Sequence, residues 1–302
     1  MILIAGASGQ LGGLIARSLL QDRKPVRILT RDGSYPSELV EAGAEPVTGD
    51  LKDPSSLRKA CAGADAVITT ANATARGGDD TIETVDRVGN RNLVEAAAEA
   101  GVRRFVFISV LGASADHPVP LMRAKGETEQ RLRDTEMAWT ILQPNLFMDK
   151  LPLAVVGGPV LAGQPVTLLG NGRRRHSLVA MRDVAAFAVA ALGREEAAGQ
   201  TLLIGGPQPV SLRDVVAAFE HELGRELPVR TVPLGQSVHG LPDIINELLT
   251  ALETYDSPLD TTALAAAYQI RLTTLTDFVR GFLRSSRSPQ LTATIRRPPV
   301  RS

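Results

Sequence analysis

The stretch that decides the fold opens the chain: Met1-Ile2-Leu3-Ile4-Ala5-Gly6-Ala7-Ser8-Gly9-Gln10-Leu11-Gly12. The apolar run Ile2–Ala5 predicts a buried strand, and a helical pattern over Leu11–Leu20 follows the glycines directly. At such a junction one glycine makes a tight turn, one lets the backbone approach a pyrophosphate, and one lets helix and strand pack closely. The helix N-terminus then offers N–H groups and a positive dipole to an anion. The stretch predicts a dinucleotide-binding loop, with a plain tight turn as the alternative.

Outward from this loop, short apolar runs alternate with helical patterns as far as residue 150. Runs such as Phe105–Ile108 are apolar throughout, as in strands that are covered on both faces. The expected strands are Ile2–Ala5, Val26–Thr30, Ala66–Thr70, Arg104–Ser109 and Ala138–Leu142, and the expected helices are Leu11–Leu20, Ser55–Ala62, Asn90–Ala100 and Arg123–Thr135. This alternation predicts an α/β fold with a doubly wound parallel (Rossmann) sheet as an NAD(P)-binding domain over residues 1–150.

The sequence pattern changes after Asn145, where glycine- and proline-rich loops separate short apolar segments. Helices are expected at Arg182–Leu192 and from Ser211, which has Asp214 three residues on and Gly224 at the far end. We expect a smaller α/β portion for the substrate over residues 151–283, interleaved with the first domain. Residues 284–302 hold five arginines, three prolines and no acids, so we expect a disordered tail or, alternatively, a contact for an acidic partner.

Composition excludes several classes of protein. Lys plus Arg is 33 and Asp plus Glu is 33, which argues against a nucleic-acid binder because phosphate contacts need a basic surplus. Hydrophobic residues make up 44%, enough for a full core, and the single cysteine, Cys61, excludes a disulfide scaffold. No apolar run reaches about 18 residues, and Met1 leads straight into a strand, so no membrane span or leader is expected and a cytoplasmic location is the default. No cluster of side chains has metal-ligand spacing, so no metal is expected.

The choice of dinucleotide depends on the end of the second predicted strand. An NAD-binding strand carries Asp or Glu there for the ribose 2′-hydroxyl, whereas this chain has Thr30 followed by Arg31. A guanidinium can grip a 2′-phosphate that a carboxylate would repel. We therefore expect NADP(H) to be preferred over NAD(H). The alternative is that Arg31 is an ordinary solvated arginine.

Several further segments carry a family resemblance. They are Gly6–Gly12 with its Gly-x-x-Gly-x-x-Gly spacing, Val26–Arg31, Gly49-Asp50-Leu51, Ala100–Ser109, Thr140–Phe147, Asp183-Val184-Ala185 and Thr273–Phe278. From residue 1 to about 283 the chain resembles the NmrA-like branch of the atypical short-chain dehydrogenase/reductases, which includes reductases and non-catalytic NADP sensors. The resemblance implies that the cofactor contacts the whole glycine loop, which adds Ser8, Gln10 and Leu11 to Gly6, Gly9 and Gly12. It also implies an adenine pocket lined by Asp50 and Leu51, and a border to the ribose and pyrophosphate made by Thr70, Ala71 and Asn72. The nicotinamide is implied to pack near Pro144, Asn145 and Phe147. Asp50 capping a turn and Pro144 ending a strand are the alternatives.

The resemblance also implies catalytic positions. Short-chain dehydrogenases pair a serine with a Tyr-x-x-x-Lys helix, in which the tyrosine gives a proton to the carbonyl. Ser109 and Lys125 fit the serine and the lysine, with Glu129 four residues further on, but Leu121 stands in the tyrosine position. Lys125 itself is then a candidate acid or base, and a quinone or azo acceptor needs little acid help because it takes protons from water. His117 is a candidate substitute donor, or a solvent-facing loop residue.

Weaker candidates lie later in the chain. Arg173-Arg174-Arg175-His176 follows a Gly-Asn-Gly turn and suits either an anionic substrate or, as we favour, a solvated hairpin tip. His221 is expected at the surface, and His239 lies in a loop and carries no prediction.

Two hypotheses of function follow. The first is an NADPH-dependent reductase that transfers hydride to a quinone-like, azo or conjugated carbonyl acceptor, which enters between the sheet and the smaller portion. The second is a redox sensor that binds NADP(H) without chemistry and is read by a protein partner, as Leu121 allows. A small-molecule acceptor and a protein partner or homodimer are therefore the expected partners, without nucleic acid or membrane.

Overall fold

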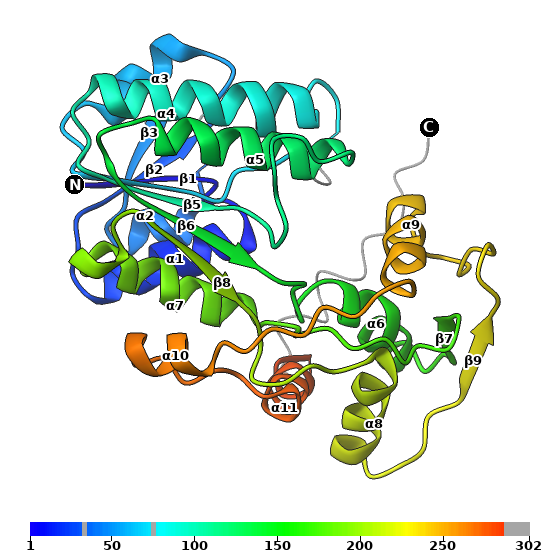
Figure 1. Cartoon of the computed structure of the whole chain (residues 1–302). Helices are drawn as coiled ribbons and strands as arrows, with labels where there is room; N and C mark the ends of the chain where they lie inside the picture. Colours follow the sequence, from blue (N-terminus) through cyan, green and yellow to red (C-terminus); the bar gives the residue numbers. More distant parts are fainter. Residues whose placement is uncertain (32–34, 74–76, 287–302) are drawn as a thin grey trace, which may run out of the picture. The chain divides into compact units, whose positions relative to one another are not determined.

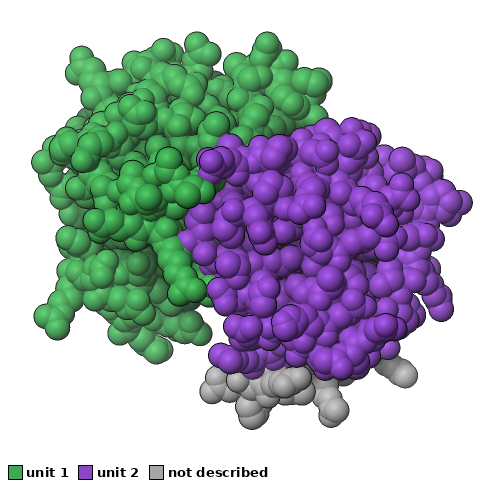
Figure 2. All heavy atoms as spheres, turned by 60° about the horizontal axis from the view of Figure 1, so that its bottom comes forward, with its two compact units in different colours: residues 1–145, 181–204, 261–271 green, residues 146–180, 205–260, 272–302 purple. Residues whose placement is uncertain are grey.

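The computed structural model describes residues 1–31, 35–73 and 77–286. They form two compact units, each assembled from separated parts of the chain and coloured green and purple in Figure 2. Unit 1 holds residues 1–145, 181–204 and 261–271, and unit 2 holds residues 146–180, 205–260 and the described residues from 272 on. Of the expected disordered tail, residues 284–286 instead form the last turn of a helix, and the rest lies outside the described residues from residue 287 on.

A parallel sheet forms the centre of unit 1 (Figure 1). Within the described residues it has seven strands in the order β3-β2-β1-β4-β5-β6-β8. They are β1 (Ile2–Ala5), β2 (Val26–Thr30), β3 (Glu45–Thr48), β4 (Ala66–Thr69), β5 (Arg104–Ile108), β6 (Ala138–Pro144) and β8 (Gln200–Ile204). The chain runs outward from β1 to β3 and returns to pair β4 with β1, so the order reverses beside β1. In such sheets, ligands bind at the carboxyl ends of the strands near this reversal.

Helices cover both faces of the sheet, which confirms the predicted doubly wound α/β fold (Figure 1). On one face lie α3 (Pro54–Cys61), α4 (Asn90–Glu99) and α5 (Pro120–Arg133), while α1 (Gln10–Gln21) and α7 (Met181–Leu192) pack together on the other. The short elements α2 (Ser37–Glu41), η3 (Glu195–Ala197) and α10 (Thr262–Tyr268) complete the unit. Because both faces are covered, the consecutive residues Phe105, Val106 and Phe107, whose side chains alternate between the two faces, are all buried.

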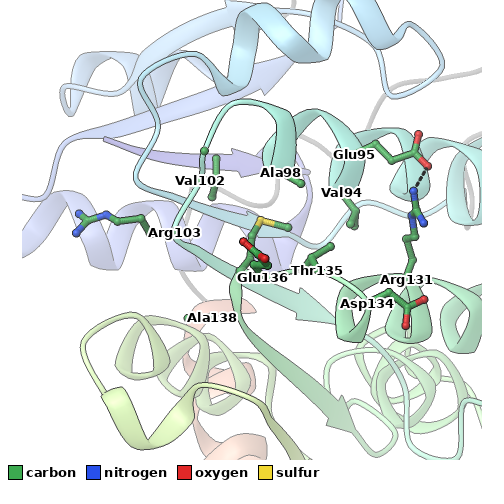
Figure 3. Close-up of a pocket in the computed structure, with 12 residues that line it drawn as sticks. Val94, Glu95, Ala98, Val102, Arg103, Arg131, Asp134, Thr135, Glu136 and Ala138 are labelled. Carbon is green, nitrogen blue, oxygen red and sulfur yellow. Dashed lines mark hydrogen bonds and ion pairs between the residues drawn. The ribbon is translucent and has the colours of Figure 1, made fainter.

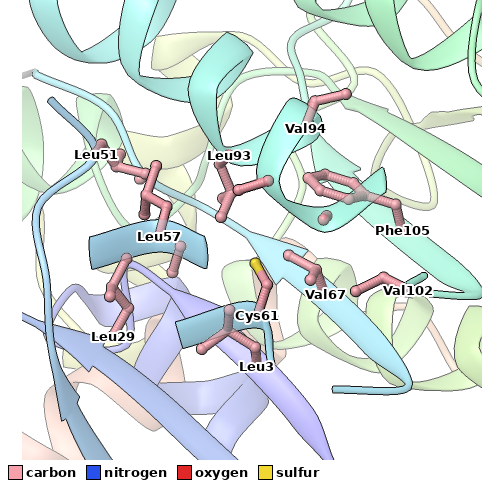
Figure 4. Close-up of a cluster of buried hydrophobic side chains, with 14 of the residues drawn as sticks. Leu3, Leu29, Leu51, Leu57, Cys61, Val67, Leu93, Val94, Val102 and Phe105 are labelled. Carbon is pink, nitrogen blue, oxygen red and sulfur yellow. The ribbon is translucent and has the colours of Figure 1, made fainter. Parts of the chain in front are cut away.

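The core between the sheet and the helices α3 and α4 is apolar and tightly filled (Figure 4). Leu3 and Val67 from the strands meet Leu57 and Leu93 from the helices. Cys61 is buried among them, and this burial raises the pKa of its thiol to about 12. Cys61 therefore acts as a small apolar residue and not as a nucleophile.

Two elements of unit 1 depart from the sequence prediction. The eight-residue π-helix η1 (Ile82–Gly89) precedes α4 without a break, and Thr81 and Thr84 cap it by binding each other's backbone N–H groups at 2.9 and 3.1 Å. Its wider turn does not follow the 3.6-residue period by which helices are recognised in a sequence. Strand β3 contains Pro46, which an edge strand tolerates but which weakens the sequence signal.

Unit 2 is built around a two-stranded parallel sheet of β7 (Val166–Leu169) and β9 (Val229–Val232). Its helices are η2 (Leu153–Gly157), α6 (Gly158–Leu161), α8 (Leu212–Leu223), α9 (Asp243–Leu252) and α11 (Leu275–Ser286). Helix α8 begins with the predicted capping box of Ser211 and Asp214 and ends at Gly224, whose φ is +65°. Phe219 and Val279 lie at the centre of its core. In the part of the chain that the structure describes, no helix has the length and apolarity needed to span a bilayer.

Candidate functional site

The glycines after β1 shape a loop that has no room for side chains at two of its positions. Gly6 has a φ of +94°, in the region that favours glycine, and a Cβ there would lie 2.5 Å from Thr70 Oγ1. A Cβ on Gly12 would lie 2.2 Å from the carbonyl oxygen of Gly6. Gly6 and Gly12 are therefore required by the close packing of the loop itself.

Gly9 has a different role, because it lies at the exposed N-terminus of α1. A Cβ on Gly9 would meet only the carbonyl oxygen of Gly6, at 3.3 Å. Its neighbours Ser8 and Gln10 are exposed, while Leu11 is buried in the core. No side chain caps α1, and no acidic residue stands in its first turn. The helix N-terminus is thus open, uncharged and positive in its dipole, as an anion site requires.

The loop after β4 lies against the glycine loop. Thr70 Oγ1 donates to the carbonyl oxygen of Gly6 at 3.3 Å, and Asn72 Nδ2 donates to the carbonyl oxygen of Thr70 at 3.3 Å. Ala71 is held by its N–H, which donates to Thr69 Oγ1, and by its carbonyl, which accepts from Asn90 Nδ2. The structure therefore brings Thr70, Ala71 and Asn72 beside the loop that the sequence singled out.

Arg31 at the end of β2 is paired with an acid. Its Nη1 lies 2.7 Å from Asp80 Oδ2, and Lys52 Nζ lies 2.9 Å from Asp80 Oδ1. The Asp80 side chain is only 5% exposed, whereas those of Arg31 and Lys52 are 44% and 32% exposed. The hydrogen bond to Asp80 raises the pKa of Lys52, so its ammonium group stays charged at neutral pH. Beside them, Thr30 Oγ1 is buried without a hydrogen-bond partner among the described residues.

Asp50 and Leu51 follow β3 and are fixed by local contacts. Asp50 Oδ1 accepts from the N–H of Lys52 at 2.8 Å, which is the turn-capping role given above as the alternative. Leu51 is buried, and its carbonyl oxygen accepts from Asn92 Nδ2 at 3.0 Å. The adenine-pocket role of Asp50 and Leu51 stays a prediction.

Lys125 of α5 is buried against the end of β5. Its Nζ donates to the carbonyl oxygen of Ile108 at 3.3 Å and lies 4.9 Å from the centre of the Phe107 ring. Asp86 Oδ1, from η1, is 3.6 Å from the same nitrogen, and the Asp86 side chain is fully buried. Burial lowers the pKa of Lys125, and the nearby carboxylate of Asp86 opposes that shift.

Ser109, the residue after β5, belongs to a buried polar network centred on Glu129. Ser109 Oγ donates to Glu129 Oε1 at 2.5 Å, and Gln143 Nε2 donates to the same oxygen at 2.8 Å. Arg133 Nη2 lies 2.9 Å from Glu129 Oε2 and balances its charge. The network fixes the hydroxyl of Ser109 one residue beyond the carbonyl that Lys125 contacts.

The described residues near Lys125 include no substitute for the missing tyrosine. Leu121 is half-buried, and Tyr268 packs on Phe187 and Arg194 near the amino end of β5, where Arg104 donates to the carbonyl of Arg194. His117, half-buried in the loop before α5, accepts from the N–H of Val119 through Nδ1 at 3.1 Å. No contact brings His117 to Lys125.

Pro144, Asn145 and Phe147 occupy the end of β6 and the chain beyond it. Pro144 accepts from the N–H of Leu111, and the buried Asn145 donates through its N–H to the carbonyl of Ile204 at 2.8 Å. Phe147 belongs to unit 2, where it forms a bridge with Val179. Pro144 is thus the last residue of β6, as in the alternative given above, and the nicotinamide role of these residues stays a prediction.

The Arg173–His176 segment differs from the predicted hairpin tip. The three arginines are exposed as expected, but His176 is only 6% exposed. Its Nδ1 lies 2.7 Å from Ser257 Oγ, and its backbone pairs with Val210. The bonds are made with residues distant in the sequence, so no local pattern indicated them. His221 is exposed as predicted.

A hollow of unit 1 lies away from these residues. It is a groove of about 620 Å³ beside α4 and α5, lined by Val102, Arg103 and Ala138 among others (Figure 3). Arg103 and Ala138 stand at the starts of β5 and β6, whereas the candidate residues follow the ends of strands. An ion pair of 2.9 Å between Arg131 and Glu95 bridges its helices. The groove therefore lies at the amino ends of the strands, and the candidate site lies at their carboxyl ends.

The residues that fit a nicotinamide dinucleotide are grouped at one edge of the sheet. The open N-terminus of α1 suits a pyrophosphate, the cations that follow β2 and β3 suit a further phosphate, and Lys125 lies near the end of β5. Sequence reasoning missed Asp80 and Asp86, because nothing in the sequence links an acid to a cation so many residues away. Among the described residues, no group of three or more His, Cys, Asp or Glu could hold a metal ion.

Comparisons with known proteins agree with this assignment. The pattern of the NAD(P)H-binding family matches residues 6–195. The chain is 32% identical over 264 residues to an NAD(P)H azoreductase of Xenophilus azovorans, a match covering 85% of this chain and 88% of that protein. It is 33% identical over 234 residues to a photosystem II assembly factor of Synechocystis sp., covering 77% and 71%. Its fold is similar to that of an NADPH-dependent quinone oxidoreductase of Escherichia coli complexed with NADPH, with a TM-score of 0.78, 22% identity and coverage of 94% and 100%.

Proposed function

The chain belongs to the NAD(P)H-binding family, and we propose that within it the chain is an NADPH-dependent reductase of a quinone-like, azo or conjugated carbonyl acceptor. This family membership agrees with the sequence motifs that resemble the NmrA-like branch of the atypical short-chain dehydrogenase/reductases. The observation that carries the proposal is the pairing, at one edge of one sheet, of an open phosphate loop with a buried lysine of lowered pKa.

The nucleotide is held mainly by backbone. In this proposal the N–H groups at the start of α1, with Gly9 between Ser8 and Gln10, receive the pyrophosphate. Thr70, Ala71 and Asn72 border it because their loop packs on Gly6. Leu51 and Asp50 line the adenine side, and Pro144, Asn145 and Phe147 the nicotinamide side, as the family resemblance implies.

The preference for NADPH over NADH is assigned to two cations, Arg31 after β2 and Lys52 after β3. A 2′-phosphate adjacent to Thr30 meets Arg31, with Lys52 on the far side of Asp80. A guanidinium forms paired, charge-assisted hydrogen bonds with phosphate, and a strand-end carboxylate that would select NAD is absent at Thr30. The phosphate competes with Asp80 for these cations, so a moderate preference is expected.

The reaction needs hydride transfer and, for some acceptors, a proton. When bound, the nicotinamide nucleotide supplies the hydride. Lys125 holds the nicotinamide ribose and supplies the proton through Nζ, since its pKa is lowered toward the working range of a general acid. Ser109 Oγ, fixed by Glu129, orients the acceptor by a hydrogen bond. His117 remains a candidate donor for acceptors that reach the loop before α5.

Two observations support this class of acceptor: the missing tyrosine and the activities for which similar proteins are named. With Leu121 in place of the tyrosine, acceptors that take their protons from water are favoured. The similar proteins named as an azoreductase and a quinone oxidoreductase support this class. The test is NADPH oxidation at 340 nm with quinones, azo dyes and enones, using Gly9→Val protein as the blank. Oxidation that depends on Gly9 supports the proposal, and a lack of oxidation with every acceptor contradicts it.

A non-catalytic role is the second candidate, because a similar protein is named as an assembly factor and the tyrosine is missing. In this role NADP(H) binds at the same loop, and a protein partner senses its presence. Partner capture from a cell lysate with and without NADPH, followed by identification of the partner, tests it. Nucleotide-dependent capture together with no NADPH oxidation favours the sensor over the reductase.

A further inference from the structure

A pair of opposite charges is buried in unit 1. Lys125 Nζ and Asp86 Oδ1 are 3.6 Å apart, and their side chains are 7% and 0% exposed. Replacing such a pair by apolar residues of similar volume is often neutral or stabilising, so fold stability alone does not explain it. A requirement for a charged lysine at this place does explain it.

The position of Asp86 adds a second observation. Asp86 Oδ2 accepts from the N–H of Ala73 at 2.9 Å, so the carboxylate that faces Lys125 also fixes the loop after β4. That loop carries Thr70, Ala71 and Asn72, which pack against the glycine loop. Asp86 stands on the π-helix η1, a wide turn of the kind found frequently at functional sites.

The other groups around Lys125 cannot replace Asp86. Glu129, on the same helix, is the other acid whose charge acts on Lys125, but Arg133 is paired with it at 2.9 Å. The carbonyl of Ile108 and the ring of Phe107 from β5 attract a cation without carrying a full charge. Without Asp86, the desolvation of Lys125 would act almost unopposed, and the neutral amine would be favoured.

We propose that Asp86 is a positioning residue of the reductase, which keeps Lys125 charged, directs it to the end of β5 and links it to the loop that borders the nucleotide. This role rests on the proposed function for what Lys125 does to the acceptor. The pairing itself is testable without any acceptor.

Direct titration of the lysines tests the pairing. The chain has only five lysines, so the ¹³Cε signals of lysine-labelled protein are few and Lys125 is assigned by the signal missing in Lys125→Met. Removing an opposite charge within about 4–6 Å lowers a lysine pKa by about 1–3 pH units, so the Lys125 midpoint should fall by that amount in Asp86→Asn. Asparagine keeps the shape and an oxygen for Ala73 N–H.

The matched control is Glu83→Gln, which removes the same charge from the same π-helix at an exposed position. Its Lys125 midpoint should equal that of the wild type. An unchanged midpoint in Asp86→Asn, or an equal fall in both variants, overturns the proposal.

Thermal melting keeps the proposal falsifiable if Asp86→Asn alone does not fold. Lys125→Met removes the ammonium group that faces the buried carboxylate of Asp86, and breaking a buried pair in this way is strongly destabilising. The double variant Asp86→Asn/Lys125→Met should therefore melt at a higher temperature than Lys125→Met. If Asp86→Asn lowers the melting temperature further in that background, the two side chains are not a pair and the proposal fails.

Kinetics then connect the pair to the reaction. A general acid works in its protonated form, so turnover declines as pH rises through the pKa of Lys125, and Asp86→Asn moves this decline to lower pH. At a fixed pH above the midpoint, kcat should fall by about tenfold for every pH unit by which the decline moves, with KM little changed. Asp86→Glu, which keeps the charge, should restore the wild-type profile in part. If the Lys125 titration midpoint is lower in Asp86→Asn but no acceptor oxidises NADPH, the pairing of Asp86 with Lys125 is supported and the proposed function fails. If the midpoint is lower but the pH profile of turnover is unchanged, the positioning role of Asp86 is overturned.

Discussion

The glycine loop and the Lys125 cluster lie at the same edge of the sheet but are built differently. The loop is made by backbone, with Gly6 and Gly12 so close that neither tolerates a side chain. The Lys125 cluster is made by side chains from η1 and α5 against strand β5. The backbone site is formed by residues that are adjacent in the sequence. The side-chain site is formed by residues that are distant in the sequence and that only the fold brings together. The two regions should therefore fail differently when they are mutated.

The largest effect is expected within the loop. Gly9→Val places a branched side chain in the exposed anion site, so it should abolish NADPH binding in a calorimetric titration while the melting temperature without ligand stays near that of the wild type. Gly12→Ala is the contrast, because its Cβ would lie 2.2 Å from the carbonyl of Gly6 and should lower the melting temperature. Binding that survives Gly9→Val would mean that the pyrophosphate lies elsewhere.

The next effect is expected at Lys125, where chemistry should suffer more than binding. Lys125→Met keeps most of the stem and removes the charge, so turnover of an acceptor that needs a donated proton should fall by about 10²–10⁴-fold, the usual contribution of positioned proton transfer. NADPH binding should weaken by only about 1–2 kcal/mol, since one hydrogen bond is lost. Steady-state rates and calorimetry measure the two quantities, with the exposed Lys59→Met as the control. Unchanged turnover would show that hydride transfer proceeds without Lys125.

A smaller effect is expected at Arg31 and should appear for one nucleotide alone. If Arg31 binds the 2′-phosphate as proposed, Arg31→Ala removes charged hydrogen bonds, so NADPH should bind more weakly by about 1.5–3 kcal/mol while NADH is nearly unaffected. Titration of both nucleotides with both proteins measures this difference. Arg58→Ala, an exposed arginine of α3, should change neither affinity. Equal losses for NADPH and NADH would remove Arg31 from the 2′-phosphate.

The smallest effect is expected at Lys52. Its side chain is one-third exposed and shares Asp80 with Arg31, so Lys52→Met should reduce NADPH affinity by about two- to fivefold at low salt, as for surface ion pairs. The loss should shrink as salt is raised, because exposed charges are screened. A loss that is the same in high salt would contradict a purely electrostatic role.

The contrast between the two regions also explains what the sequence could predict. Gly6, Gly9 and Gly12 and the strand before them are contiguous, and the alternating apolar runs were enough to predict the parallel sheet. Lys125 and Ser109 were singled out by the family resemblance, and the structure brings both to the end of β5. Asp86 was not found, because it lies on a π-helix whose period hides it and 39 residues before its partner. His176 was misjudged because its partners are distant in the chain.

The division of unit 1 into three stretches of chain has a consequence for biosynthesis. Strand β8 pairs with β6, yet the ribosome completes β6 at residue 144 and reaches β8 only after making residues 146–180 and α7. Until then the nascent sheet ends at β6 with an unpaired edge, which is a template for misassociation with other chains. Domains that occupy one continuous stretch fold as they emerge, N-terminal first. Unit 1 cannot do so, because residues 261–271 complete it, and its final assembly therefore comes late in translation.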